Sequence, residues 1–204
     1  SQGKSSRQKR DRFVLSNLQV FRGQTLDMEW KNNYQVKKSV KTILSKSNLY
    51  QLMKLIYNAG LFQVVLPSTK KIIDQPQFDG YHSHPVDIHS IKTLKFSQTI
   101  EDSYIKSIFD DLTNEQKIIV RLVAFFHDIG KGRTDDHHIV GEKLFKSMMK
   151  SFDFSEELIK LGARLVRYHN MMSYMATHED IYSEKTILNF TGLIKTKEAL
   201  KMLY

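Results

Sequence analysis

The sequence predicts an all-α domain with a small non-helical segment at its N-terminus. From Tyr34 onward, apolar residues recur at the spacing of one helix face, and capping or turn residues separate the successive runs. Before Tyr34, two short β-prone pieces, Phe13–Leu15 and Leu18–Phe21, are typical of a hairpin or an irregular strand. Residues 1–11 are rich in Ser, Gln, Lys and Arg, which indicates a disordered arm or a remnant of cloning.

The composition is that of a soluble globular protein. The 204 residues suffice for one sizeable domain, of which 41% of the residues are hydrophobic and 26% charged. No stretch approaches the roughly 20 apolar residues of a membrane span, and no membrane partner is expected. The polar, basic N-terminus lacks the apolar region of a secretory signal. The absence of cysteine leaves His, Asp and Glu as metal ligands, and we expect a cytoplasmic location.

The chain carries a net charge of +9, which favours phosphorylated or polyanionic partners. Its lysines are scattered along the presumed helix faces, and no basic stripe interleaved with aromatic residues is present. We therefore interpret most of the excess charge as solvated surface, and nucleic acid is not the expected partner.

The first two helices are predicted from apolar spacing. One begins near Tyr34 and places Val40 and Leu44 on the same face; the next begins near Leu49 and ends at Asn58-Ala59-Gly60, where glycine follows the helix end. The segment Leu61–Asp79 contains two prolines and is predicted to be mainly loop.

Later helices are marked by capping signals as well. Thr113 precedes Gln116 by three residues, a capping-box arrangement that opens a helix ending near residues 126–129. The remaining predicted helices are Val86–Phe96, Ser103–Leu112, Val140–Phe152, Ser155–His169, Glu184–Phe190, and a last one that starts near Thr196 and is cut short.

The segment Phe126-His127-Asp128-Ile129-Gly130-Lys131-Gly132-Arg133 follows an apolar run and carries the strongest chemical signal. Imidazole nitrogen and carboxylate oxygen are complementary ligands for a divalent metal. A carboxylate at the end of a buried helix is costly unless it is paired or coordinated. The glycines and the two cations that follow suit an anion such as phosphate.

Three further segments place histidine at the edge of a predicted helix: Asp87-Ile88-His89-Ser90, Asp136-His137-His138 and Arg167-Tyr168-His169-Asn170. Bundles build metal sites from side chains on facing helices, so these segments could converge on the His-Asp pair. Taken singly, each histidine is more often an ordinary surface or core residue.

The blocks FHDIGKGRTDDHHIVG, RYHNMMS and QFDGYHSHPVDIHSIKTL resemble, in order and spacing, those of the HD domain of bacterial PII uridylyltransferase/uridylyl-removing enzymes. That domain is part of the HD superfamily of metal-dependent phosphohydrolases. The resemblance covers about Leu49 to Phe190 and implies a helical HD bundle over residues 34–204. Residues 12–33 are then a candidate tail of a preceding nucleotidyltransferase module.

The resemblance also implies roles for individual residues. His138 stands where the relatives have a small polar residue and is ranked below His137. Asp128, Lys131 and Arg133 would be catalytic, with both cations also binding phosphate and His82 lining the substrate mouth. The implied metal ligands are His89, His127, Asp128, His137 and His169.

The family's last ligand is an aspartate on a later helix, and this sequence ends at Tyr204, short of that position. Asp180 is the nearest late aspartate, but it lies in a presumed loop and does not match. The resemblance therefore implies an HD domain truncated at its C-terminus, with a metal site that could be weakened.

The implied activity is hydrolysis of a nucleotidyl–tyrosine phosphodiester, with two divalent ions activating a bridging water. The expected metals are Mn or Mg, with Fe, Co or Zn as further candidates. The substrate would be uridylylated PII, the product UMP, and the process nitrogen regulation. Two alternatives stay open: an HD phosphohydrolase acting on a cyclic dinucleotide or guanosine polyphosphate, and a non-catalytic module that binds nucleotide or PII.

Overall fold

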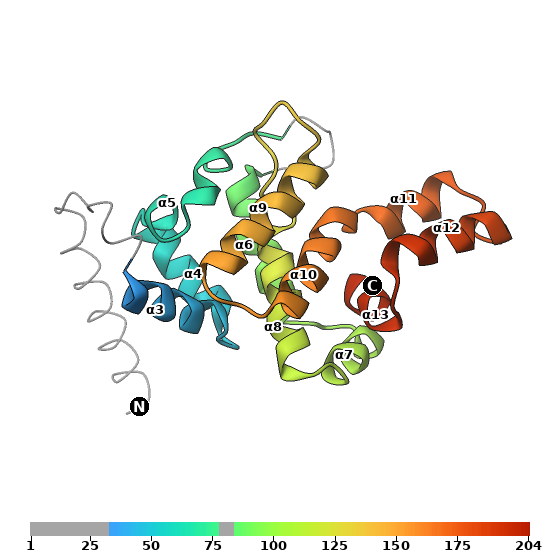
Figure 1. Ribbon diagram of the computed structural model, residues 1–204, viewed down its shortest axis with the longest axis horizontal. Helices are drawn as coiled ribbons and strands as arrows, with labels where there is room; N and C mark the ends of the chain where they lie inside the picture. The colour runs from blue at the N-terminus through green and yellow to red at the C-terminus, as the bar shows by residue number, and fades with distance from the viewer. Residues whose placement is uncertain (1–32, 78–83) are drawn as a thin grey trace.

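A computed structural model describes residues 33–77 and 84–204, and this part of the chain is helical without strands (Figure 1). The prediction of an all-α fold is confirmed. The predicted β-prone pieces between Arg12 and Gly23, and the candidate substrate residue His82, lie outside the described residues.

The N-terminal half follows the predicted order of helices, labelled as in Figure 1. The helices are α3 (Tyr34–Leu44), α4 (Leu49–Asn58), α5 (Phe62–Val65), the 3₁₀ helix η1 (Pro67–Lys71), α6 (Val86–Gln98) and α7 (Ser103–Asp110). Gly60 has a φ of 69° just after α4, as expected of a glycine beyond a helix end. The prediction that residues 61–79 are mainly loop is wrong in part, because Phe62 and Leu66 are buried and bring two short helical turns onto the core.

The second half contains α8 (Asn114–Phe126), α9 (His137–Ser151), α10 (Glu156–Tyr168), α11 (Met171–His178), α12 (Glu184–Ile194) and α13 (Lys197–Leu203). The predicted capping box is present: the Thr113 side chain accepts from the Gln116 amide, and the Gln116 side chain accepts from the Thr113 amide. Helix α9 begins earlier than predicted because Asp136 caps it. Helix α11 was not predicted; its residues lack a buried apolar face.

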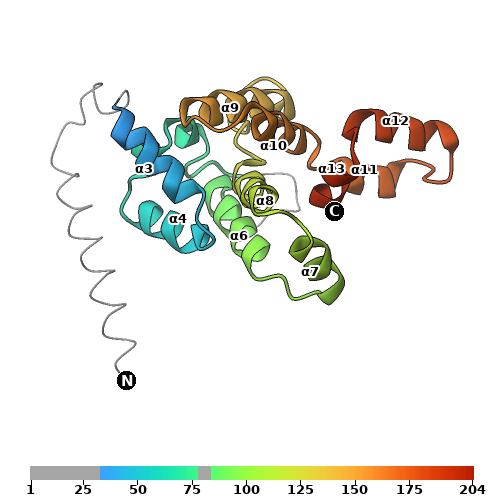
Figure 2. The ribbon, with the colours of Figure 1, turned by 60° about the horizontal axis from the view of Figure 1, so that its bottom comes forward.

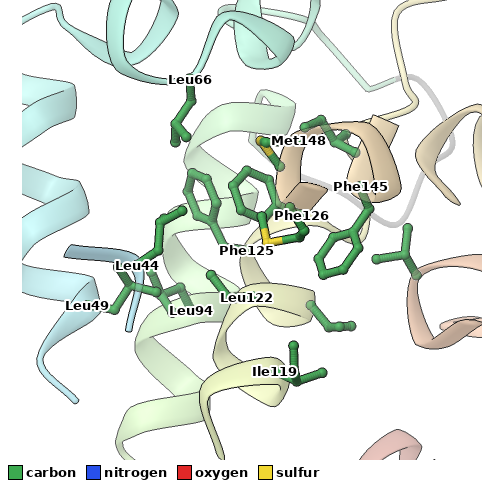
Figure 3. Packing of buried hydrophobic residues seen from close by; sticks show 14 of the residues in the cluster. Leu44, Leu49, Leu66, Leu94, Ile119, Leu122, Phe125, Phe126, Phe145 and Met148 are labelled. Carbon is green, nitrogen blue, oxygen red and sulfur yellow. The ribbon is translucent and has the colours of Figure 1, made fainter. Parts of the chain in front are cut away.

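Helix α8 lies at the centre of the bundle. It packs against α6 on one side and α10 on another, and α10 packs against α9. Figure 3 shows Phe125 and Phe126 of α8 beside Leu122, with Phe145 of α9 close by. Phe126 and Phe145 meet edge to face with their ring centroids 6.2 Å apart. These contacts bring the C-terminal ends of α8 and α10 close to the start of α9.

Helices α11 and α12 lie to one side of this bundle in both Figure 1 and Figure 2. The chain then returns, and the ring of Tyr204 packs edge to face against Tyr104 of α7 with centroids 6.1 Å apart. Among the described residues, no helix is both long enough and apolar enough to cross a membrane.

Gly130 joins the turn after α8 to α9 through direct backbone contact, because a Cβ built there would lie 1.9 Å from the carbonyl oxygen of His137. We predict that Gly130→Ala lowers the free energy of unfolding by at least about 1–3 kcal/mol, the usual cost of overpacking. Gly192→Ala in α12 is the matched control, since no atom lies within 4 Å of its Cβ. The free energy of unfolding of Gly192→Ala should be unchanged or higher by up to about 1 kcal/mol, because alanine favours a helix more than glycine does. Urea unfolding of both variants measures this; equal effects would contradict it.

Candidate metal centre

His127 ends α8 and turns its ring back onto that helix. Its Nδ1 lies 3.0 Å from the carbonyl oxygen of Ala124. A carbonyl only accepts hydrogen bonds, so Nδ1 carries the hydrogen and Nε2 is left to face the neighbouring side chains. The C-terminal turn of α8 thus sets both the orientation and the tautomer of this ring.

His169 repeats the arrangement at the end of α10. Its Nδ1 lies 2.8 Å from the carbonyl oxygen of Val166, and its Nε2 lies 3.7 Å from Oδ1 of Asp128. The rings of His127 and His169 are 5.0 Å apart, edge to face. Burial, followed by the charge of His127, lowers the pKa of His169 from 6.5 to about 3. His169 is therefore a neutral imidazole at physiological pH.

Asp128 is the buried carboxylate around which the histidines gather, with only 2% of its surface exposed. Burial alone raises its pKa, but the neighbouring His127 and Lys131 outweigh burial and hold the pKa well below its usual range. Nζ of Lys131 lies 2.9 Å from Asp128 Oδ2, and Nε2 of His127 lies 3.3 Å from the same oxygen. The carboxylate is thus ionised at neutral pH.

His89 reaches this cluster from the first turn of α6. Its Nε2 lies 3.0 Å from Nε2 of His127 and 3.8 Å from Oδ2 of Asp128. Two imidazole nitrogens and one carboxylate oxygen, all atoms of the kind that bind divalent metals, therefore meet in one small space. His89, His127 and Asp128 form one group with ligand atoms within 4.8 Å of one another.

The start of α6 is anchored by a residue that the sequence interpretation missed. Asp87 is fully buried and accepts hydrogen bonds from the Tyr57 hydroxyl and the Asp74 amide, each at 3.1 Å. Burial and this carboxylate raise the pKa of Tyr57 to about 12, so the hydroxyl stays a donor. An aspartate two residues before His89 was the available signal, but its partners are distant in sequence.

His137 and His138 open α9, behind the Asp136 cap. Nδ1 of His138 lies 3.2 Å from Oδ1 of Asp136, whereas the buried Nε2 of His137 has no hydrogen-bond partner. Burial, then the charge of His138, lowers the pKa of His137. His137, His138 and His169 form a second group with ligand atoms within 4.8 Å of one another. The sequence interpretation ranked His138 below His137, and the structure places both beside His169.

The two cations after the His-Asp pair have different surroundings. Lys131 contacts Asp128 and also donates to the Gln77 side chain at 2.6 Å, a partner that the sequence did not indicate. Arg133 donates to the carbonyls of Ile129 and Lys131 at 2.8 and 3.0 Å, and burial lowers its pKa. Arg133 therefore stabilises the conformation of the loop after the His-Asp pair. Its role toward phosphate stays a prediction.

Asp180 takes no part in the cluster. Its side chain accepts a hydrogen bond from the Tyr182 amide at 3.0 Å in the turn before α12. Neither group of candidate ligands in the described part of the chain includes it. This agrees with the interpretation that Asp180 does not match the family's late aspartate.

A helical bundle in which a His-Asp pair meets histidines from three further segments is the arrangement expected of an HD domain. A family model of the HD domain matches residues 86–195, and the chain belongs to this family. The match includes the early histidine of α6, the His-Asp pair and the histidines of α9 and α10. The domain limits at residues 11, 33 and 34 stay predictions.

Within that family the chain is similar to bifunctional uridylyltransferase/uridylyl-removing enzymes. It is 33% identical to that of Vibrio parahaemolyticus over 162 residues, 76% of this chain and 18% of the relative. It is 30% identical to that of Zymomonas mobilis over 158 residues, 75% of this chain and 17% of the relative. It is 28% identical to the enzyme of Bradyrhizobium diazoefficiens over 184 residues, which are 87% of this chain and 20% of the relative. The chain thus spans about a fifth of these relatives.

The low pKa of His169 gives a pH prediction for the metal-free protein. Below about pH 6.5 an unfolded chain takes up a proton at this residue that the folded protein refuses until about pH 3, so stability falls as the pH is lowered through that window. At pH 5, ¹⁵N NMR should show a neutral imidazole with hydrogen on Nδ1. His169→Gln assigns the signals by removing them. A doubly protonated ring at pH 5 would contradict the prediction.

Proposed function

We propose that this site binds divalent metal and hydrolyses a phosphodiester. The observation that carries the proposal is the convergence of Nε2 of His89, Nε2 of His127 and Oδ2 of Asp128, which lie within 3.8 Å of one another. Helix carbonyls take the Nδ1 hydrogens of His127 and His169, an arrangement typical of metal-binding imidazoles.

The donor set fits a transition metal. Imidazole suits Mn, Fe, Co and Zn, and Mg fits if it retains several waters. The buried, unpartnered Nε2 of His137 supports this assignment, because an unsatisfied buried polar atom is costly and a metal would relieve that cost. We propose His89, His127, Asp128, His137 and His169 as ligands, with His138 beside the last two.

The residues of the chain prepare the site for a phosphate ester. Asp128 stays ionised and balances bound cations, while Lys131 presents an ammonium group next to it. Lys131 would neutralise charge on the phosphoryl oxygens, the electrostatic role that dominates phosphoryl transfer. Metal bound at this cluster would lower the pKa of water and supply a nucleophile near neutral pH.

The substrate follows from the relatives. The similar enzymes are named for a uridylyl-removing activity as well as for uridylyl transfer. We therefore propose that this chain removes UMP from uridylylated PII, using Mn or Mg as the metal. The candidate actions on a cyclic dinucleotide or guanosine polyphosphate, and simple binding without turnover, are the outcomes that the experiment must separate from it.

Asp128→Ala is expected to abolish metal binding and turnover, because it removes the carboxylate of the group with His89 and His127, whose Oδ1 also lies 3.7 Å from Nε2 of His169 in the other group. Loss of a ligand should cost more than the roughly 10–100-fold in affinity that loss of an outer-sphere partner costs. Calorimetric titration with Mn²⁺ and release of UMP from uridylylated PII measure the two effects. His178→Ala, which removes an exposed histidine of α11, is the control and should leave both unchanged.

Each other result has a clear meaning. If the chain hydrolyses only cyclic dinucleotides or guanosine polyphosphate, uridylylated PII is not its substrate and one of these nucleotides is. Metal binding with no hydrolysis of any of them, while PII still binds, would favour the non-catalytic module. Failure of Mn²⁺, Zn²⁺, Co²⁺ and Mg²⁺ alike to bind the wild-type chain would overturn the proposal.

Lys131→Met should separate binding of metal from handling of phosphate. We expect kcat to fall about 100-fold or more, the usual effect of losing one group that stabilises transition-state charge. Affinity for Mn²⁺ should be unchanged or higher, because a competing cation leaves Oδ2 of Asp128. Lys143→Met, at an exposed position of α9, is the matched control. A loss of metal affinity in Lys131→Met would show that the residue supports the ligands instead.

A further inference from the structure

A polar pocket, distinct from the candidate metal centre, lies where α9, α10 and the end of α12 meet. Its cavity volume is about 280 Å³. The residues that line it include none of the candidate metal ligands. They are mainly basic: Glu142, Lys146, Lys160, Arg164, Arg167, Tyr168, Gly192, Leu193 and Lys195.

The charge of this pocket is strongly unbalanced. Five cationic side chains face one carboxylate, that of Glu142. Glu142 is already engaged by Lys146, one helical turn away, and by Arg167, whose Nη1 lies 3.4 Å from its Oε2. The remaining three cations therefore have no acidic partner in the pocket, and their mutual repulsion favours an anion there.

Those three cations are also largely free to bind. Lys160 and Lys195 are exposed, and their side chains make no hydrogen bond or ion pair with any described residue. Arg164 donates to the carbonyl oxygen of Ile194 at 3.4 Å, and its guanidinium makes no ion pair with any described residue. Because Lys160, Arg164 and Arg167 follow one another at helical spacing, they share a face of α10.

The shape of the pocket limits the size of its ligand. A volume of 280 Å³ is close to the lower end, roughly 300 Å³, of small-molecule sites. Gly192 leaves one wall open, since a Cβ built there would meet no atom within 4 Å. Tyr168 and Leu193 add apolar surface beside the cations. A compact anion with a small organic part fits this space better than a protein segment.

We propose that this pocket binds a small molecule of the phosphate-ester class, with at least two negative charges. Guanidinium groups hold phosphate oxygens in pairs, and lysines add point charges, so two arginines and three lysines form a suitable set. The site is separate from the candidate metal centre and needs no metal. It does not depend on the function proposed above.

Pyrophosphate is the probe, titrated into the metal-free chain in the presence of a chelator and followed by ¹⁵N NMR. The amide of Gly192 reports on this pocket, and the amide of Gly132 reports on the loop beside Lys131. We expect Gly192 to shift and to saturate with one pyrophosphate bound. A shift of Gly132 alone would place the anion at the catalytic loop and overturn the proposal.

The double variant K160Q/K195Q tests the pocket without removing an intramolecular partner. It should bind pyrophosphate at least about tenfold more weakly, since it removes two of the five cationic side chains that line the pocket. K143Q/K150Q on α9 changes the net charge equally but lies outside the pocket, and it should bind within twofold of wild type. Equal weakening of both variants would mean diffuse attraction by net charge and no site.

Discussion

The structure depends on one buried carboxylate. Asp128 is almost fully covered, yet it stays ionised because its contacts with His127 and Lys131 outweigh the effect of burial. An uncompensated buried charge would cost more than a domain of this size can tolerate. The ends of α8 and α10 and the starts of α6 and α9 therefore meet near this residue.

Most of the helices could be predicted because their signals are local. The capping box of α8, the glycine after α4 and the polar caps Ser155 and Thr196 all act within one helical turn. The candidate ligands could be named for a similar reason, since each histidine stands at the edge of a predicted helix. Their convergence was an inference from the resemblance, and the structure places them side by side.

Other features could not be read from the sequence because their partners are remote. The anchor of α6 joins Asp87 to Tyr57 and to the backbone of Asp74, and Lys131 donates to Gln77. Arg133 also donates to the carbonyl oxygen of Ser68 at 3.4 Å, a partner far away in the sequence, and its role toward phosphate stays a prediction. Helix α11 carries no periodic apolar face, and so local patterning could not reveal it.

The backbone contact at Gly130 has a mechanical consequence for the centre. The turn that carries His127 and Asp128 rests directly on the first residue of α9, so neither segment can slide without moving the other. Main-chain packing thus determines the spacing between the backbone segments that carry His127 and Asp128 and those that carry His137 and His138. Two ions held there would have a separation set before they bind, and a phosphodiester would have to match it. Selectivity would then begin with the rigidity of the frame.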